Sequence, residues 1–289
     1  MKMSATVFGC MRLKDDPLGH SASRMLEKIE FCLEHGVTTF DHADIYGDYE
    51  CESIFGQALK EKPHLRDQMQ LVSKCGICLT SEKKPHHTVK HYNYSKQHII
   101  SSVETSLTNL NTDHLDLLLL HRPSPLLDPE EVAEAFDQLK TQGKTFHFGV
   151  SNFTPSQTRL LRSMIPLAAQ QVEVSLIRDE ALLDGTVDDS LENNMHVMAW
   201  SPLAGGQIAA NTHGNQTLES CLLELSAKYK CSVASLGYAW IFSHPAKIHV
   251  VTGTNKEERI KECLAAQSLR LETVDWFRIW QARRGQPVP

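Results

Sequence analysis

Leu115-Asp-Leu-Leu-Leu-Leu120, followed by His121, is the stretch that most constrains the fold of this chain. It is short and almost entirely apolar, and only Asp116 interrupts the leucines. Runs of this kind are typical of strands that are buried on both faces of a parallel sheet. The sequence therefore predicts an interior strand at 115–120 in a sheet with both faces covered.

Similar short strands alternate along the chain with amphipathic helical stretches. The expected strands are 6–10, 37–41, 69–73, 115–120, 145–150, 169–174, 196–200 and 248–252. The expected helices are 23–35, 52–60, 95–110, 129–142, 155–164, 186–194 and 218–243. Eight strands that alternate with helices, with no composition break between the halves, fit a closed barrel better than an open doubly wound sheet. A Rossmann sheet would also carry G-x-G-x-x-G after its first strand, and no such run occurs. We predict an α/β fold, a (β/α)8 TIM barrel, as a single domain over residues 1–289.

Composition excludes several classes of partner. The chain has 289 residues, 41% of them hydrophobic, and a formal net charge of −6 at pH 7. This charge gives no electrostatic case for binding nucleic acid or an anionic membrane. No apolar run approaches the roughly 20 residues that span a bilayer, and the first residues lack the pattern of a signal peptide. We therefore expect a cytoplasmic monomer whose eight scattered cysteines are thiols.

Polar residues stand where three consecutive strands end. Asp41 closes the strand at 37–41, Lys74 follows the strand at 69–73, and His121 follows the strand at 115–120, with Tyr46 a few residues beyond Asp41. Singly, the lysine could be a solvated edge charge, the aspartate a helix cap and the histidine a satisfied core residue. In barrels of this kind, however, the chemistry lies at the carboxyl ends of the strands. Their recurrence at one rim favours a catalytic site.

The chemistry of these four residues is coherent. A tyrosine with a pKa of roughly 10 is a reluctant acid at neutral pH. A nearby ammonium group should lower that pKa and ease proton donation, while Asp41 keeps the buried lysine charged. His121 can orient a carbonyl oxygen toward Tyr46. The set can protonate an oxyanion as it forms, but it contains no source of hydride.

Several motifs resemble those of the aldo-keto reductases, in the family's order and spacing. They are Phe40-Asp-His-Ala-Asp-Ile-Tyr-Gly47, Ser73-Lys-Cys75, Leu117-Leu-Leu-Leu-His121 and Gly149-Val-Ser-Asn-Phe153. The resemblance runs from Phe8 to about Leu264. It is nearest to a bacterial subgroup of predicted NADP-dependent oxidoreductases, which carry the string Asp41-His-Ala-Asp-Ile-Tyr-Gly47 and a segment like Trp276-Phe-Arg-Ile279.

The resemblance implies NADPH-dependent reduction of an aldehyde or ketone, with Asp41, Tyr46, Lys74 and His121 as the catalytic tetrad. It also implies a set of NADP(H) contacts. Ser151, Asn152 and Gln171 match residues that bind the nicotinamide carboxamide, and Trp200 matches the residue that stacks on the nicotinamide ring. Ser201 and Leu203 match the pyrophosphate contacts, Thr254 and Arg259 the 2′-phosphate contacts, and Glu262 a contact to the adenine amine.

Two other functions stay open at this point. One is a metal-dependent hydrolase on the same barrel, with His42, Asp44 and His121 as ligands. It lacks the H-x-H opening of such enzymes and leaves Lys74 without a role. The other is an NADPH-binding regulator or sensor with little turnover, which an intact tetrad does not exclude.

The long loop 76–94 contributes no predicted site. It carries His86, His87 and His91, and we find no cysteine or acidic residue at ligand spacing, so a solvated loop is expected and no metal site is predicted. Cys75-Gly-Ile-Cys78 does not open a helix, which argues against a redox motif. The natural substrate and the direction of the reaction are not indicated.

Overall fold

A computed structural model describes residues 1–288. Eight parallel strands form a closed barrel in the order β1-β10-β9-β8-β7-β6-β3-β2. The strands are β1 (Thr6–Gly9), β2 (Thr39–Asp41), β3 (Gln70–Cys75), β6 (Leu115–Leu120), β7 (Thr145–Ser151), β8 (Ala169–Glu173), β9 (His196–Trp200) and β10 (His249–Thr252). Each begins and ends close to its predicted position. The predicted TIM-barrel fold is confirmed.

Helices follow most strands. They are α1 (Ala22–Glu34), α2 (Tyr46–Tyr49), α3 (Cys51–Glu61), α4 (Lys96–Leu110), α5 (Pro129–Thr141), α6 (Pro155–Arg162), α7 (Thr186–Glu192), α8 (Gln207–Ala210), α9 (Gln216–Tyr229), α10 (Val233–Phe242), α11 (Glu257–Ala266) and α12 (Thr273–Arg284). Short 3-10 helices lie at η1 (Cys10–Asp15), η2 (Pro63–Gln68), η3 (Glu180–Leu182) and η4 (Ala204–Gly206). A separate antiparallel hairpin joins β4 (Ile77–Cys78) to β5 (His91–Tyr92).

One predicted helix was wrong. The stretch 218–243 is not continuous but forms α9 and α10. Lys230 takes a left-handed conformation with φ of 52°, which ends α9. The Ser232 side chain then accepts a hydrogen bond from the Ser235 amide and caps α10. Both halves are apolar enough to look like one helix in sequence.

The chain divides into two compact units. The first unit comprises Met1–Gln171 with Gly253–Asn255, and the second comprises Val172–Thr252 and the residues from Lys256 onward. The prediction of a single domain over 1–289 stays a prediction. Among residues 1–288, no helix combines the length and the apolar character that crossing a membrane requires.

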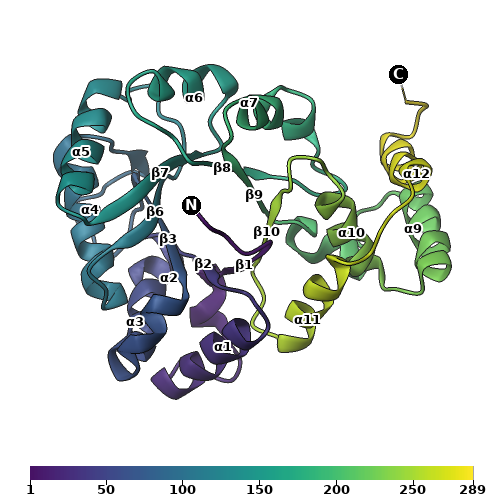
Figure 1. Cartoon of the computed structure of the whole chain (residues 1–289), viewed down its shortest axis with the longest axis horizontal. Helices are drawn as coiled ribbons and strands as arrows, with labels where there is room; N and C mark the ends of the chain where they lie inside the picture. Colours follow the sequence, from purple (N-terminus) through teal and green to yellow (C-terminus); the bar gives the residue numbers. More distant parts are fainter. Residues whose placement is uncertain (289) are drawn as a thin grey trace. The chain divides into compact units, whose positions relative to one another are not determined.

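Strands β2, β3, β6 and β7 form the core of the first unit, with α3, α4 and α5 on their outer side (Figure 1). In β6, Leu117 and Leu119 have no exposed surface, as the apolar run predicts. Helices α3 and α4 pack so closely that a Cβ atom added to Gly56 would lie 1.9 Å from the Asn109 carbonyl oxygen. This contact leaves little freedom in how α3 and α4 pack beside the strands.

The second unit has its own apolar core, and α9 and α12 lie side by side in it (Figure 1). Trp240 and Trp276 stack with ring centroids 4.6 Å apart, and each indole N–H donates to the other residue's carbonyl oxygen. Asp275, nearly fully buried, accepts hydrogen bonds from Lys228 at 2.6 Å and Tyr229 at 2.7 Å. These contacts give the Trp276-Phe-Arg-Ile279 segment a structural role as the anchor of α12.

Candidate active site

Three adjacent strands of the first unit bring the predicted tetrad together. Asp41 is the last residue of β2, Lys74 lies near the end of β3, and His121 directly follows β6. Strand β3 pairs in parallel with both β2 and β6, with Lys74 opposite Leu119. Since the carboxyl ends of parallel neighbours meet at one edge, these side chains share a rim. Tyr46 is the first residue of α2.

Lys74 is the centre of this cluster. Its Nζ donates to Asp41 Oδ2 at 2.8 Å, to Tyr46 Oη at 3.0 Å and to the His42 carbonyl oxygen at 2.7 Å. An ammonium group has three protons, so these contacts satisfy all of them. The lysine is 1% exposed, and its charge therefore depends on these partners rather than on water.

The Lys74 ammonium stays charged in this position. Burial by itself lowers the pKa of Lys74, but the Asp41 carboxylate and Tyr46 more than offset that effect, so the pKa is raised overall. The predicted role of Asp41, which is to keep a buried lysine protonated, agrees with this balance.

The pKa of Tyr46 moves opposite to the prediction. Burial raises it, and the lowering effect of the nearby Lys74 charge and hydrogen bond is smaller, so the net pKa lies above its usual value. The prediction of a lowered pKa was wrong because it left out desolvation of the phenolate. At neutral pH the phenol therefore holds its proton, and Lys74 reduces the cost of releasing it.

His121 faces Tyr46, with the two rings edge to face and their centroids 5.9 Å apart. Burial and the charges of Lys74 and Arg122 hold the pKa of His121 well below its usual value, so the imidazole is neutral. Within residues 1–288 its buried Nδ1 has no hydrogen-bond partner. Such a nitrogen is costly to bury unless a ligand pairs with it. The neutral ring also carries one N–H, which can donate a hydrogen bond to a substrate oxygen.

The predicted carboxamide-binding residues adjoin this cluster. Ser151 ends β7, and Asn152 follows it with a left-handed φ of 62°. The backbone N–H of Asn152 donates to the Gln171 carbonyl oxygen at 2.8 Å, and the side-chain Nδ2 of Asn152 donates to Ser151 Oγ at 2.7 Å. Gln171 Nε2 donates to Asp41 Oδ1 at 2.9 Å. The structure thus adds a contact that sequence reasoning missed, since Gln171 also orients the tetrad carboxylate.

Thr254 lies in a short segment that is held firmly within the first unit. Arg12 Nη1 donates to the Gly253 carbonyl at 2.9 Å, and Asn255 Nδ2 donates to the Arg12 carbonyl at 2.7 Å. Lys28 Nζ donates to both the carbonyl and the side-chain oxygen of Asn255 at 3.1 Å. Sequence reasoning missed Arg12 and Lys28. The one available signal was a lysine on the apolar face of α1, between Met25 and Ile29.

The remaining predicted residues belong to the second unit. Trp200, half-buried, ends β9, and Ser201 follows with a left-handed φ of 53°. The Leu203 side chain packs over Gly237, where an added Cβ would lie 2.8 Å from it. On α11, Arg259 is exposed, whereas the carboxylate of Glu262 accepts a hydrogen bond from the Ser232 hydroxyl. Glu262 is therefore already engaged with the start of α10.

The structure does not support the metal-hydrolase alternative. In the described part of the chain, the one group of three or more His, Cys, Asp or Glu side chains close enough to share a metal is Cys78, His87 and His91. The proposed ligands His42, Asp44 and His121 do not form such a group. None of the eight cysteines forms a disulfide with another described residue.

Comparison with known proteins agrees with this geometry. The sequence model of the Aldo/keto reductase family matches residues 5–284. An uncharacterized oxidoreductase, YcsN, of Bacillus subtilis is 45% identical over 293 residues, covering 100% of this chain and 97% of the relative. A 6-dehydroglucose reductase of Agrobacterium fabrum is 39% identical, covering 100% of this chain and 97% of the relative.

A solved structure shows the same fold. The aldo/keto reductase of Klebsiella pneumoniae, crystallised with NADP and acetate, superposes with a TM-score of 0.78 at 24% identity, covering 99% of this chain and 93% of the other. The likeness in sequence and in fold therefore extends over nearly the whole chain. The chain belongs to the aldo/keto reductase family and is an oxidoreductase.

Proposed function

We propose that this protein reduces an aldehyde or a ketone to an alcohol with NADPH, and that Tyr46 gives its proton to the carbonyl oxygen. One observation carries the proposal: the buried Lys74 ammonium is bonded at once to the Asp41 carboxylate and to the Tyr46 hydroxyl. A tyrosine held in this way can release its proton to a substrate oxygen.

Each residue of the tetrad has a defined task in this reaction. As the substrate oxygen gains negative charge, the Tyr46 Oη–H bond breaks and the proton moves to that oxygen. The phenolate left behind lies 3.0 Å from the Lys74 ammonium, which stabilises it. Asp41 keeps that ammonium charged, and Gln171 fixes the orientation of Asp41. The neutral imidazole of His121 holds the substrate oxygen beside Tyr46.

The residues of both units fit NADP(H) by their chemistry. In the first unit, Ser151, Asn152 and Gln171 offer hydroxyl and amide groups, which can donate to and accept from a carboxamide. In the second unit, Trp200 offers a ring for stacking, and the exposed guanidinium of Arg259 suits a phosphate. Ser201, Leu203, Thr254 and Glu262 complete the proposed set, for the pyrophosphate, the 2′-phosphate and the adenine. NADPH, when bound, supplies the hydride.

The substrate is proposed to be a small carbonyl compound. Because a 39%-identical relative is a 6-dehydroglucose reductase, 6-dehydroglucose is the first compound to test. Aromatic and aliphatic aldehydes, ketones and dicarbonyls complete the panel. The formal net charge of −6 gives no support for nucleic acid as a partner, and eight cysteines without a disulfide fit a reducing compartment such as the cytoplasm. We propose that the protein acts there as a monomer.

NADPH oxidation, followed by its near-ultraviolet absorbance, tests the proposal with Tyr46→Phe beside the unchanged protein. Losing a general acid typically costs roughly 10²- to 10⁴-fold in rate, so turnover should fall by that factor while NADPH affinity stays the same. Tyr49→Phe is the matched control, because its hydroxyl accepts from the Leu79 amide and has no contact with Lys74.

Three results are informative. Loss in Tyr46→Phe but not in Tyr49→Phe supports Tyr46 as the proton donor. A Tyr46→Phe protein that keeps most of its rate overturns that assignment. NADPH binding by the unchanged protein without turnover of any compound in the panel favours a regulatory protein over a reductase.

A further inference from the structure

The loop 76–94 gathers nitrogen and sulfur side chains that the proposed reaction does not use. It begins as the hairpin of β4 and β5, in which Cys78 pairs directly with His91. Side chains of directly opposed residues in antiparallel strands lie on the same face, about 5 Å apart at Cβ. The hairpin therefore places a thiol beside an imidazole although 13 positions separate them in sequence.

Two more histidines join this pair. Ligand atoms of Cys78, His87 and His91 all lie within 4.8 Å of one another. His98, in the first turn of α4, has its Nε2 at 3.8 Å from Cys78 Sγ. Cys78, His87 and His98 also line a cavity of about 320 Å³. The cluster thus joins the hairpin, the loop between its strands and the start of α4.

The Nδ1 atoms of two of these histidines lie close to backbone carbonyl oxygens. His87 Nδ1 lies 3.1 Å from the Leu79 carbonyl oxygen, and His91 Nδ1 lies 2.8 Å from the Val89 carbonyl oxygen. A carbonyl only accepts hydrogen bonds, so each Nδ1 carries the proton and each Nε2 keeps a free electron pair. Metal-binding histidines are typically fixed by this kind of contact from the second ring nitrogen.

We propose that Cys78, His87 and His91 bind a zinc ion, and that His98, which lies near Cys78 but outside this group of three, moves toward the ion to become the fourth ligand. One thiolate and three imidazoles suit the tetrahedral, nitrogen- and sulfur-preferring Zn²⁺ ion. Zinc bond lengths near 2.3 Å to sulfur and 2.0 Å to nitrogen imply a sulfur–nitrogen separation of about 3.5 Å. The 3.8 Å between Cys78 and His98 is close to this value, and the ligand atoms of Cys78, His87 and His91, which lie within 4.8 Å of one another, would draw closer as the ion binds. As the zinc–sulfur bond forms, the Cys78 thiol releases its proton to solvent.

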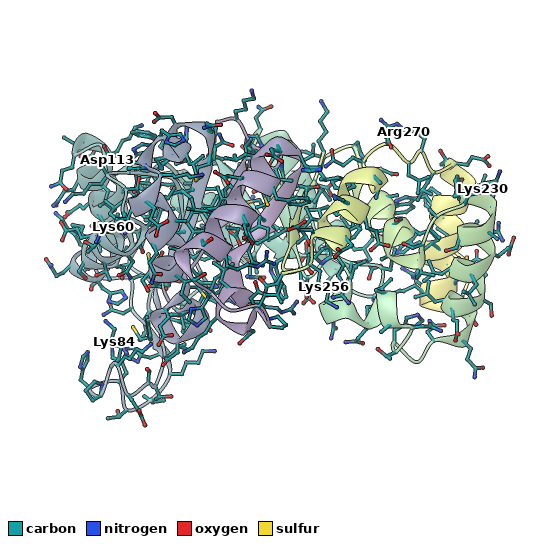
Figure 2. The ribbon with its side chains drawn as sticks, turned by 90° about the horizontal axis from the view of Figure 1, so that it is seen from below. Lys60, Lys84, Asp113, Lys230, Lys256 and Arg270 are labelled. Atoms are coloured by element: carbon teal, nitrogen blue, oxygen red, sulfur yellow. The ribbon has the colours of Figure 1, made fainter. Side chains whose placement is uncertain are left out.

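The ion would brace the loop. The segment that carries Lys84 projects away from the part of the first unit that carries Lys60 and Asp113 (Figure 2). Cys78 is 1% exposed, whereas His91 is exposed, so the ion reaches the site from the solvent side. Bound there, it would link the projecting loop to β4 and α4, close to where β3 presents Lys74. The inferred role is structural, and it does not depend on the proposed reductase activity.

The test uses the full chain, freed of metal with a chelator and kept reduced. Zinc binding is measured by titration calorimetry and metal content, and cobalt binding by its visible absorption and its sulfur-to-cobalt charge-transfer band. The variants Cys78→Ser, His87→Ala, His91→Ala and His98→Ala each remove one proposed ligand. His86→Ala is the matched control, since His86 adjoins His87 but lies outside the ligand group. Circular dichroism checks that each variant is folded.

We expect one zinc per chain and a charge-transfer band from cobalt. Because losing a mere supporting contact already costs roughly 10- to 100-fold in affinity, each ligand variant should weaken zinc at least about 100-fold. Cys78→Ser should also lose the charge-transfer band, and His86→Ala should bind normally. Failure of the unchanged protein to bind one zinc, or unchanged affinity in Cys78→Ser, would overturn the proposal. Unchanged affinity in His98→Ala would remove His98 from the ligand set.

Discussion

Two clusters on either side of Gly76 differ in how their polar groups are satisfied. Around Lys74, a cation, a carboxylate, a phenol and a carbonyl oxygen pair with one another, and the lysine and the aspartate are buried. Around Cys78, the converging groups are one thiol and several imidazoles, all of which can give an electron pair to a metal. The polar groups around Lys74 satisfy one another, and such a cluster can hold and release a proton. The groups around Cys78 are all electron-pair donors, so a metal ion is needed to bind them together.

The largest expected effect comes from opening the first cluster. Lys74→Met removes the cation that is bonded to Asp41 there and leaves a buried carboxylate without its ion pair. Breaking a buried ion pair in this way typically costs about 3–5 kcal/mol of stability. Turnover should also fall by roughly 10²- to 10⁴-fold, because Tyr46 loses the charge that stabilises its phenolate. Urea unfolding and NADPH oxidation measure the two effects.

The double variant Asp41→Asn/Lys74→Met separates these effects. The double variant should recover much of the stability, since no unpaired charge is left buried. It should recover none of the turnover. If the double variant is no more stable than Lys74→Met, the ion pair is not the source of the lost stability.

A smaller effect is expected at Gly76, which separates the two clusters. Its φ is +104°, and an added Cβ would lie 2.0 Å from the Tyr94 ring. Tyr94 in turn exchanges hydrogen bonds with the backbone of Arg122, directly after His121. Gly76→Ala should cost about 2–4 kcal/mol, from the strained backbone together with the overlap.

Gly143→Ala is the matched control for this change. Its φ is +69°, but nothing lies within 4 Å of the added Cβ, so only the backbone cost of about 1 kcal/mol is expected. Unfolding midpoints in urea compare the two. Equal losses of stability in Gly76→Ala and Gly143→Ala would mean that the ring of Tyr94 moves aside. The contact between Gly76 and Tyr94 would then not couple the two clusters.

A third prediction concerns His42, whose carbonyl serves Lys74 while its ring is fully buried. Within residues 1–288 neither ring nitrogen has a hydrogen-bond partner, and burial together with the Lys74 charge lowers the pKa to about 3. Between the ordinary value of roughly 6.5 and pH 3, the unfolded chain therefore binds a proton that the folded chain does not. The stability contributed by a neutral His42 is lost as pH falls through that window, by about 1.4 kcal/mol per pH unit.

His42→Leu should remove this pH dependence. At pH 7 its stability should be close to that of the unchanged protein, because it replaces an unpaired polar ring with an apolar side chain. At pH 5 it should be more stable than the unchanged protein by about 2 kcal/mol, as measured by urea unfolding. His121 titrates equally in both proteins and cancels. Parallel pH profiles would show that His42 is not the group responsible.

The sequence predicted the first cluster better than the second for a physical reason. The short apolar runs and the polar residues that end them are local signals, and parallel pairing of neighbouring strands follows from the barrel itself. The amino-acid sequence alone was therefore enough to place Asp41, Lys74 and His121 together. The raised pKa of Tyr46 could not be predicted, since it depends on how much of the ring is buried.

The loop cluster depended on a pairing that spacing does not reveal. Cys78 meets His91 only because β4 and β5 form a hairpin, and each strand is two residues long. Such short strands carry no detectable alternation of apolar and polar residues. The break between α9 and α10 was not predicted for a similar reason, because it depends on the left-handed backbone of Lys230 in an otherwise apolar stretch.

The smallest expected effect tests what holds the projecting loop. Lys83 donates to the Asp48 carbonyl at 2.7 Å and pairs with the Glu50 carboxylate, tying the loop to α2. These groups are well exposed, and exposed ion pairs typically contribute less than about 1 kcal/mol. Lys83→Met should therefore change the unfolding free energy by less than that, with a smaller effect at high salt.

Added zinc should make the change in unfolding free energy caused by Lys83→Met smaller still. If the ion binds Cys78, His87 and His91, it holds the loop independently of Lys83. The loss measured by urea unfolding in Lys83→Met should then shrink further when zinc is added. A loss as large as that of Gly76→Ala, unaffected by zinc, would mean instead that surface charges hold the loop. The second cluster would then lack the bracing role that its geometry suggests, even if it binds the ion.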